Sequence, residues 1–210
     1  MTISLEHIGK RFNYDWIFRG LNFTFTTGRR YAILGPNGSG KSTLLQIIAG
    51  YLSYNEGKVH YRYDTQSEKE HPSSDTLFHR LSLAAPYLEL IEEFTLRELL
   101  DFHGRFKPFI PGISVSDIMR QVGLEQSADK QIRHFSSGMK QRAKLAQAFF
   151  SDTPLLLLDE PCTNLDVAGV HLYHHLMERY SADKLVIVSS NEPKEYDLCG
   201  EHLQIDHFKS

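Results

Sequence analysis

The sequence predicts an α/β fold built on a mostly parallel sheet, and three observations support this. Short apolar strands alternate with amphipathic helices along most of the chain. A glycine-rich turn joins one such strand directly to one such helix, at 35–42. A run of leucines at 155–158 has the length of a strand that is buried on both faces, as strands of parallel sheets are.

The elements are predicted from periodicity and from turn residues. Alternation of apolar and polar residues predicts two strands of an antiparallel edge, and apolar runs predict the other strands; they lie at 3–8, 21–26, 29–34, 57–63, 155–161 and 185–190. Helical spacing is found at 42–52, 95–106, 115–124, 137–150 and 167–180. The polar stretch 64–76 is predicted to be a surface loop. We therefore expect one domain, 1–210, with a helical lobe at about 87–148 inserted in the α/β core.

Composition excludes several classes of protein. The 210 residues are 41% apolar and 23% charged, as in ordinary globular proteins, and the net charge of −3 with no basic run argues against nucleic acid as a partner. Two cysteines, Cys162 and Cys199, give no disulfide framework, which favours a reducing, cytoplasmic setting. The N-terminus lacks the apolar core of a signal peptide, and no run approaches the ~20 residues of a membrane span. A membrane role would therefore need a separate partner.

The glycine-rich turn carries the strongest chemical signal. It matches G-x-x-x-x-G-K-[ST] and consists of Gly35, Pro36, Asn37, Gly38, Ser39, Gly40, Lys41, Ser42 and Thr43. Glycines let successive backbone N–H groups converge on phosphate oxygens, and the helix that follows adds its positive N-terminal end. We expect Lys41 to reach the β- and γ-phosphates of a nucleotide and Ser42 to bind Mg²⁺.

Two further segments bear polar groups suited to the same ligand. Asp159 and Glu160 end the leucine strand, at the edge of the sheet where open α/β folds bind ligands. Asp159 is expected to hold Mg²⁺, largely through water, and Glu160 to polarise the water that attacks the γ-phosphate. Ser136, Ser137 and Gly138 precede a helix and offer a second phosphate-binding device, although alone they describe an ordinary N-cap.

Together these elements resemble the ATPase subunit of ABC transporters over nearly the whole chain. The resemblance identifies FSSGMKQR (135–142) with the family's signature motif, so that Ser136, Ser137, Gly138 and Met139 would contact an ATP held by a second subunit. Residues 163–166 resemble the D-loop, which crosses between subunits. Phe12 lies where the family stacks an aromatic ring on adenine, the alternative being a core phenylalanine. The resemblance implies ATP and Mg²⁺ as cofactors and a pair of ABC subunits, identical or paralogous.

The chain departs from the family at two positions. Pro86 stands where the family has a glutamine that reaches Mg²⁺, so that water or a carboxylate such as Glu89 would complete the metal shell. Asn191 stands where the family has a catalytic histidine. Its amide can hydrogen-bond the γ-phosphate but carries no positive charge. With Glu160, Lys41 and Asn191 as the catalytic set, we expect slow turnover.

The remaining candidates have ordinary explanations. His171, His174 and His175 have metal-ligand spacing on a helix, but a solvated or interfacial face explains them as well, and Cys162 is better explained by packing. One apolar cluster is either core of the lobe or, by the resemblance, the groove that receives a short helix of a membrane subunit; it comprises Tyr87, Leu88, Leu90, Ile91 and Phe94.

The sequence thus predicts an ATP-binding and ATP-hydrolysing subunit of an ABC transporter. An exporter is favoured by the short chain, the S-S-G-M signature variant and the apolar run after Pro86. The partner would be an integral membrane permease, which would hold the chain at the cytoplasmic face of the cell membrane and select the substrate. Two alternatives stay open: a soluble ABC ATPase acting in assembly or remodelling, and a regulatory nucleotide-binding module.

Overall fold

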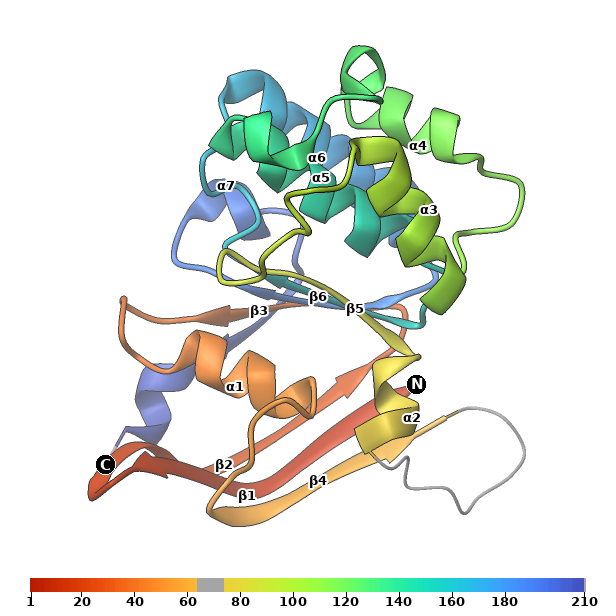
Figure 1. Ribbon diagram of the computed structural model, residues 1–210. Helices are drawn as coiled ribbons and strands as arrows, with labels where there is room; N and C mark the ends of the chain where they lie inside the picture. The colour runs from red at the N-terminus through yellow and green to blue at the C-terminus, as the bar shows by residue number, and fades with distance from the viewer. Residues whose placement is uncertain (64–73, 210) are drawn as a thin grey trace.

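A parallel sheet of five strands forms the centre of the chain, which a computed structural model describes for residues 1–63 and 74–209 (Figure 1). The strand order is β5–β6–β7–β3–β8, and every neighbouring pair is parallel. The strands are β3 (Arg30–Leu34), β5 (Leu81–Ala84), β6 (Leu155–Asp159), β7 (Leu185–Ser189) and β8 (Glu201–Gln204). Their carboxyl ends share one edge, so residues that follow different strands meet there.

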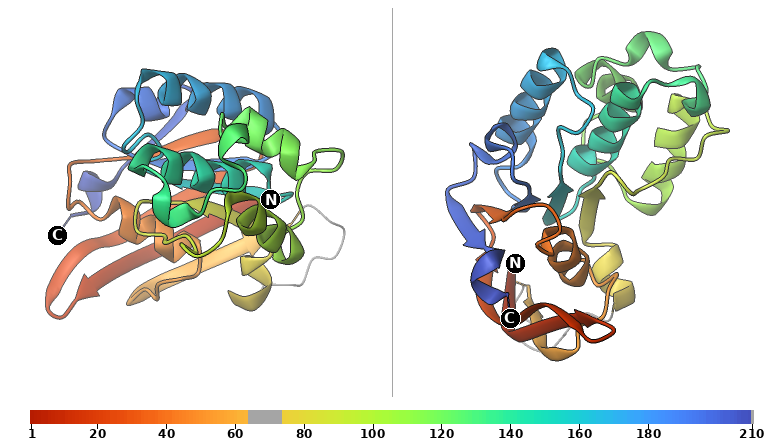
Figure 2. Two further views of the ribbon diagram at one scale, coloured as in Figure 1. Left: turned by 45° about the horizontal axis from the view of Figure 1, so that its top comes forward. Right: turned by 90° about the vertical axis from the view of Figure 1, so that its left-hand side faces the viewer.

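An antiparallel sheet of three strands lies below the parallel one, in the order β2–β1–β4. It comprises β1 (Thr2–Phe12), β2 (Asp15–Thr26) and β4 (Glu56–Arg62). Helix α1 (Lys41–Ile48) lies between the two sheets, as the right-hand view of Figure 2 shows. Its apolar residues and the inward side chains of β1 and β2 fill one of the two hydrophobic cores.

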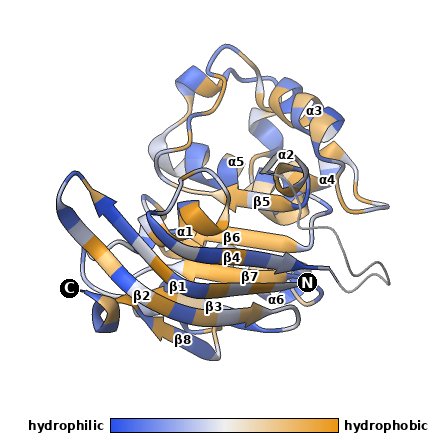
Figure 3. Ribbon diagram, turned by 90° about the horizontal axis from the view of Figure 1, so that it is seen from below, coloured by the Kyte–Doolittle hydropathy of each residue, from blue (hydrophilic) through white to orange (hydrophobic). Residues whose placement is uncertain are grey.

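The leucine run of β6 serves both cores, because successive side chains of a strand point to opposite faces. Leu155 and Leu157 pack toward α1 and the antiparallel sheet, whereas Leu156 and Leu158 pack toward the helices on the other face. The neighbouring strand β7 divides its apolar residues in the same way. Figure 3 shows β6 and β7 hydrophobic along their length, as strands covered on both faces must be.

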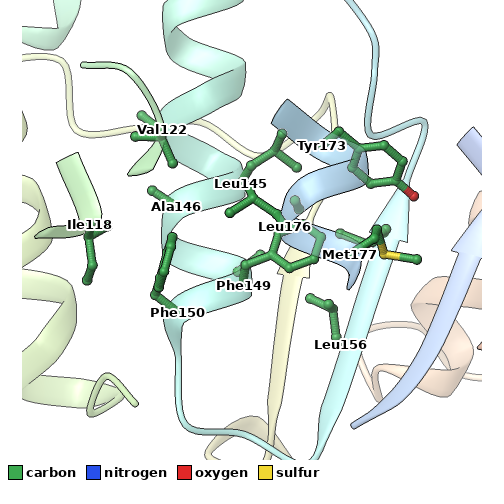
Figure 4. Packing of buried hydrophobic residues seen from close by; sticks show 14 of the residues in the cluster. Ile118, Val122, Leu145, Ala146, Phe149, Phe150, Leu156, Tyr173, Leu176 and Met177 are labelled. Atoms are coloured by element: carbon green, nitrogen blue, oxygen red, sulfur yellow. The ribbon is translucent and has the colours of Figure 1, made fainter. Parts of the chain in front are cut away.

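Several helices cover the opposite face of the parallel sheet (Figure 1). They are α3 (Leu96–Phe106), α4 (Val115–Gln121), α5 (Ser137–Phe150), α6 (Val167–Tyr180) and the short α7 (Pro193–Tyr196). Phe149 and Phe150 of α5 pack among residues of α4, α6 and β6, as Figure 4 shows. Reciprocal side-chain caps start α3 and α4, at Thr95 with Glu98 and at Ser114 with Asp117.

The fold class predicted from the sequence is confirmed: a parallel α/β core, an antiparallel sheet and an inserted group of helices. Several element bounds differ. Strands β1 and β2 are longer than 3–8 and 21–26, because they pair up to a tight turn at Asn13, whose φ is 54°. The predicted loop 64–76 is wrong at its end, where α2 (Ser74–Phe78) begins; 64–73 lies outside the described residues.

Helix α1 ends at Ile48, short of the predicted 42–52, and Gly50 follows with a φ of 75°. A left-handed residue at this point satisfies carbonyls at the end of a helix. Within the described parts of the chain, no helix has the length and apolar character needed to cross a lipid bilayer.

Candidate functional site

Three predicted site segments converge at the carboxyl edge of the parallel sheet. The glycine-rich loop follows β3, Glu160 follows β6, and Asn191 lies two residues after the end of β7. In the sheet Asp159 pairs with Ser189, and Ser189 pairs with Ile33. Two backbone bonds extend this register past the strands, from Glu160 N–H to Ser189 O at 2.9 Å and from Ser190 N–H to Ile33 O at 3.2 Å.

The phosphate-binding loop needs its glycines for steric reasons. Gly38 and Gly40 have φ values of 77° and 99°, which side chains with a Cβ rarely adopt. A Cβ on Gly40 would lie 2.4 Å from Ile17 Cγ2, and one on Gly35 would lie 2.7 Å from Ser39 Oγ. The loop therefore approaches its surroundings at a distance that only glycine permits. Its Ser39 N–H donates to Pro36 O at 3.1 Å, and successive N–H groups of such a loop can converge on an anion.

Lys41 begins α1 and is buried, with its ammonium held by the loop itself. Its Nζ donates to Gly35 O at 2.8 Å and to Pro36 O at 3.1 Å. The loop and Glu160 line a cleft of about 210 Å³, formed by Ile17, Asn37, Gly38, Gly40, Lys41, Ser42, Thr43 and Glu160. A positive end of a helix, a lysine and a carboxylate thus face the same cleft, as phosphoryl transfer requires.

Asp159 and Ser42 provide the donor set that a magnesium ion needs. Asp159 is only 1% exposed, and the Ser42 hydroxyl hydrogen-bonds its carboxylate. Its Oδ1 is buried and, among the described residues, has no hydrogen-bond partner. Burial raises the pKa of this carboxyl above its usual value, although hydrogen bonds from Ser189 and Ser42 and the charge of Lys41 act in the opposite direction. A buried carboxylate oxygen without a partner, next to a hydroxyl, fits a hard divalent cation.

Glu160 has a strained backbone that sets the direction of its side chain. Its φ of 43° is in the left-handed region, which is uncommon for a residue other than glycine. The Thr163 hydroxyl lies 3.5 Å from Glu160 Oε2, and Thr163 N–H donates to Glu160 O at 3.1 Å. This tight turn directs the carboxylate into the cleft of the phosphate-binding loop. Asn191 is exposed beside the same edge.

The segment at 135–139 forms the start of α5. Ser136 is the N-cap, and its hydroxyl accepts from Met139 N–H at 3.2 Å. Gly138 lies against the turn after β6: a Cβ there would be 3.0 Å from Asn164 O. Ser136 and Ser137 are exposed, so their hydroxyls and the first turn of α5 face solvent. These residues line a cleft of about 650 Å³ together with Asn164, Leu165 and Asp166.

The chain does not bring its two phosphate-binding devices together. No residue lines both the cleft at Lys41 and the cleft at Ser136. Phe12 ends β1 with its ring 47% exposed and the Lys10 ammonium 4.8 Å from the ring centroid. The alternative of a core phenylalanine is therefore wrong, and the ring is accessible to a ligand.

Of the two candidates to replace the glutamine missing at Pro86, water and the Glu89 carboxylate, the structure disfavours Glu89. Pro86 follows β5 and is exposed, and its carbonyl accepts from Lys144 Nζ at 2.9 Å. Glu89 interacts with the charge of Lys144 and lines a groove with Lys140 and Lys144, away from the cleft at Lys41. Glu89 thus lies near Lys144 of α5 and does not line the cleft at Lys41.

Sequence analysis missed two buried groups that link the site segments. Glu195 accepts from Cys162 N–H at 2.7 Å and from the Ser190 hydroxyl, so it joins the turns after β6 and β7. Gln141 of α5 donates to Pro161 O at 2.7 Å. Gln141 lies inside the 135–142 motif and Glu195 follows Asn191 by four residues, and these positions are their one local signal, because contacts between distant turns leave no local pattern.

The histidines and cysteines lie outside the cleft. His174 lies 2.6 Å from Lys194 O and 3.4 Å from an Asp197 carboxylate oxygen, and His171 and His175 are exposed. Burial raises the pKa of the Cys162 thiol to about 12, so this thiol is not a nucleophile at neutral pH.

Comparison with known proteins agrees with this geometry. The family model described as ABC transporter matches residues 18–163. The chain is 30% identical to Nod factor export ATP-binding protein I of Rhizobium sp. (strain N33), over 99% of this chain and 68% of that protein. It is 28% identical to the uncharacterized ABC transporter ATP-binding protein YybJ of Bacillus subtilis (strain 168), over 98% and 93%.

A solved structure of a dimeric bacterial ABC transporter cassette superposes with a TM-score of 0.80 at 21% identity, over 97% of this chain and 94% of that one. At this identity the likeness establishes the fold. The chain thus spans about two thirds of the length of the Nod factor export relative and nearly all of YybJ.

Proposed function

Because the chain belongs to the ABC transporter family of ATP-binding proteins, we propose that it is the ATPase subunit of an exporter whose membrane part is a separate polypeptide. As a member of this family it is an ATP-binding subunit and an ATPase. The observation that carries the proposal for the site is the meeting of the phosphate-binding loop, the buried Asp159 and Glu160 at one edge of the sheet.

The residues of the cleft have distinct roles in this proposal. Lys41 exchanges its bonds to the loop carbonyls for the β- and γ-phosphates, and the loop N–H groups hold the same phosphates. Ser42 and Asp159 would hold Mg²⁺, and the bound cation would supply positive charge opposite these phosphates. Glu160 polarises the water that attacks the γ-phosphate, and its strained turn holds the carboxylate toward the cleft.

The asparagine at position 191 supports the expectation that ATP turnover is slow. It lies two residues after the end of β7, where its amide can hydrogen-bond a γ-phosphate without adding positive charge. Loss of one charged transition-state contact costs on the order of 10²–10³ in rate. We therefore expect turnover well below that of a chain with histidine there, and Asn191→His to increase it.

A pair of ABC subunits would complete the site. The phosphate-binding loop and the start of α5 open into separate clefts of one chain, and both are accessible. In a head-to-tail pair, the exposed Ser136 and Ser137 of one chain would close over an ATP held by Lys41 of the other. The dimeric cassette with the same fold supports this arrangement.

A groove on the helical side supports a membrane partner. It has a volume of about 310 Å³ and lies between β5, α3 and α5. Five of its rings and aliphatic side chains are more than a third exposed, namely Tyr51, Phe78, Ile91, Phe102 and Phe106. Exposed apolar side chains gathered in one groove are typical of a binding site for an amphipathic helix. The name of the Nod factor export relative favours export as the direction of transport.

Co-purification tests the transporter proposal against a soluble remodelling ATPase. The tagged chain is extracted from its native cells in mild detergent and the bound proteins are identified. We expect a stoichiometric multi-span membrane protein. Recovery without a membrane protein would instead support the soluble machine.

Glu160→Gln tests the catalytic assignment. It keeps the shape of the side chain and removes the charge that polarises water. We expect ATP hydrolysis to fall at least a hundredfold, while ATP binding persists and ATP-dependent dimers accumulate on size-exclusion chromatography. Unchanged hydrolysis in this variant would refute the role of Glu160.

A further inference from the structure

The turn after β5 lies beside the cation site although Pro86 offers it no ligand. β5 pairs in parallel with β6, and Ala84 lies opposite Leu158. The next residue, Ala85, is therefore level with Asp159, and the chain at Pro86 and Tyr87 runs past the carboxyl edge of the sheet. A side chain that this turn directs toward the sheet edge can therefore approach the Asp159 carboxylate.

Helix α5 holds this turn in place. Lys144 Nζ donates to Ala85 O at 3.1 Å and to Pro86 O at 2.9 Å. Two bonds from one ammonium to successive carbonyls fix the path of the backbone, and the proline restricts it further. The direction of the next side chain, that of Tyr87, is therefore set by the fold.

The Tyr87 hydroxyl reaches the polar surroundings of Asp159. The Gln46 side chain hydrogen-bonds this hydroxyl, and the phenol is close enough to Asp159 for the two groups to interact electrostatically. Gln46 lies on α1 four residues after Ser42, so the two side chains share one face of the helix. Tyr87, Gln46, Ser42 and Asp159 thus form one polar group around the cation site.

The phenol is a neutral hydrogen-bond donor at physiological pH. Burial raises the pKa of Tyr87 to about 12, so the hydroxyl keeps its proton. The residue is nevertheless 44% exposed, so its hydroxyl is accessible to a ligand or to water. A neutral hydroxyl can donate to a water of the magnesium shell or to a phosphate oxygen, and magnesium bound to proteins keeps several waters.

We propose that Tyr87, oriented by Gln46 and by the turn that Lys144 holds, supplies the polar contact to the Mg²⁺-nucleotide site that Pro86 cannot supply. Tyr87 then acts as a positioning residue for the bound cation. This inference rests on the proposed ATP site. It also gives Tyr87 a different role from the other residues of the apolar cluster predicted from the sequence, because Leu88 and Ile91 line the groove on the helical side.

Equilibrium binding of a non-hydrolysable ATP analogue tests the inference. The dissociation constant of the full chain is measured with Mg²⁺ and with EDTA, and the ratio of the two gives the gain from the cation. Tyr87→Phe removes only the hydroxyl. One lost hydrogen bond corresponds to about a three- to tenfold change in affinity. We expect the gain from Mg²⁺ to fall by this factor and the affinity in EDTA to stay unchanged.

Tyr54→Phe is the matched control, because Tyr54 is exposed to a similar extent but interacts with Tyr61, whereas Tyr87 interacts with Gln46 and Asp159. It should bind as the wild type does under both conditions. If Mg²⁺ increases the affinity of the wild type and of Tyr87→Phe by the same factor, the inference about Tyr87 is wrong, while the proposed ATP site is unaffected. No binding, or no gain, in the wild type would refute the proposed site and the inference with it.

Discussion

Glu195 is expected to hold the two catalytic turns in register, and its removal should destabilise the chain measurably. Its side chain is buried and accepts from Cys162 N–H at 2.7 Å and from the Ser190 hydroxyl. Cys162 follows Glu160 by two residues, and Ser190 immediately precedes Asn191. The perturbation we propose is Glu195→Ala, which removes both acceptors at once.

The magnitude follows from the groups that lose their partner. Of the two donors, the Ser190 hydroxyl can rotate away, whereas the Cys162 N–H cannot, and one buried donor left without an acceptor costs about 1–3 kcal/mol. The lost packing of the side chain adds about 1 kcal/mol. We expect a total of about 2–4 kcal/mol. For a chain of this size each kcal/mol lowers the melting temperature by roughly 2–4 °C, so the variant should melt roughly 5–15 °C below the wild type.

Two further variants isolate the cause. Glu195→Gln keeps an oxygen for Cys162 N–H and an amide that can donate to Ser190 Oγ. Because burial raises the pKa of Glu195, the charged form is disfavoured, and a neutral amide should cost less than about 1 kcal/mol. Glu192→Ala is the surface control: Glu192 is exposed, and its backbone N–H makes the bond to Ser190 Oγ at 2.9 Å.

The assay is thermal unfolding followed by far-ultraviolet circular dichroism, together with the rate of ATP hydrolysis. Glu195→Ala should lose stability and hydrolysis, whereas Glu195→Gln should keep both. Two results would refute the reasoning: a melting temperature of Glu195→Ala equal to that of Glu192→Ala, or an equal loss in Glu195→Gln. The first result would mean that the Glu195 carboxylate does not stabilise the two turns. The second would mean that its hydrogen bonds are not the cause of the stabilisation.

Three further predictions address the loop, the adenine site and pH. Gly40→Ala should weaken ATP binding more than tenfold, because its Cβ would lie 2.4 Å from Ile17 Cγ2 at a φ of 99°. In the same titration Gly200→Ala should bind ATP normally, because a Cβ at Gly200 would have no atom within 4 Å. Phe12→Ala should weaken ATP binding about tenfold, by the loss of one stacked base, and leave binding of inorganic tripolyphosphate unchanged; equal losses for both ligands would contradict stacking. Burial lowers the pKa of His103 in the folded chain to about 4, whereas in the unfolded chain it is about 6.5. Between these two pH values the unfolded chain binds more protons, so the free energy of unfolding falls as pH drops from about 6.5 toward 4. Between about pH 7 and pH 4.5, the free energy of unfolding of the wild type should fall about 2 kcal/mol more than that of His103→Gln, measured by urea titration.

Local sequence was sufficient wherever one segment contains both the structural and the chemical signal. The loop at 35–43 needs only its glycines, its lysine and the strand and helix that flank it, and all of these are adjacent in the chain. The run at 155–158 predicts a strand covered on both faces, because leucines at successive positions must point to both. The roles of these residues in binding and hydrolysis stay predictions for the experiments above.

Weak local signals explain the element bounds that were missed. The first half of β2 reads DWIFRG, without clean alternation, and it is a strand because it pairs with β1 up to the turn at Asn13. β5 spans only four residues, and it is fixed by pairing with β6. Such strands depend on a neighbour that is distant in sequence, which single-segment patterns do not contain.

By itself, then, the sequence determined the α/β class, the order of its motifs and the two departures from the family, because each is written in contiguous residues. Tertiary structure alone decided which residues share a site. The register of β5 against β6 places Tyr87 beside Asp159, and a buried carboxylate at Glu195 joins turns that follow different strands. These contacts arise where parallel strands end side by side, and the distance between such ends is unrelated to their separation along the chain.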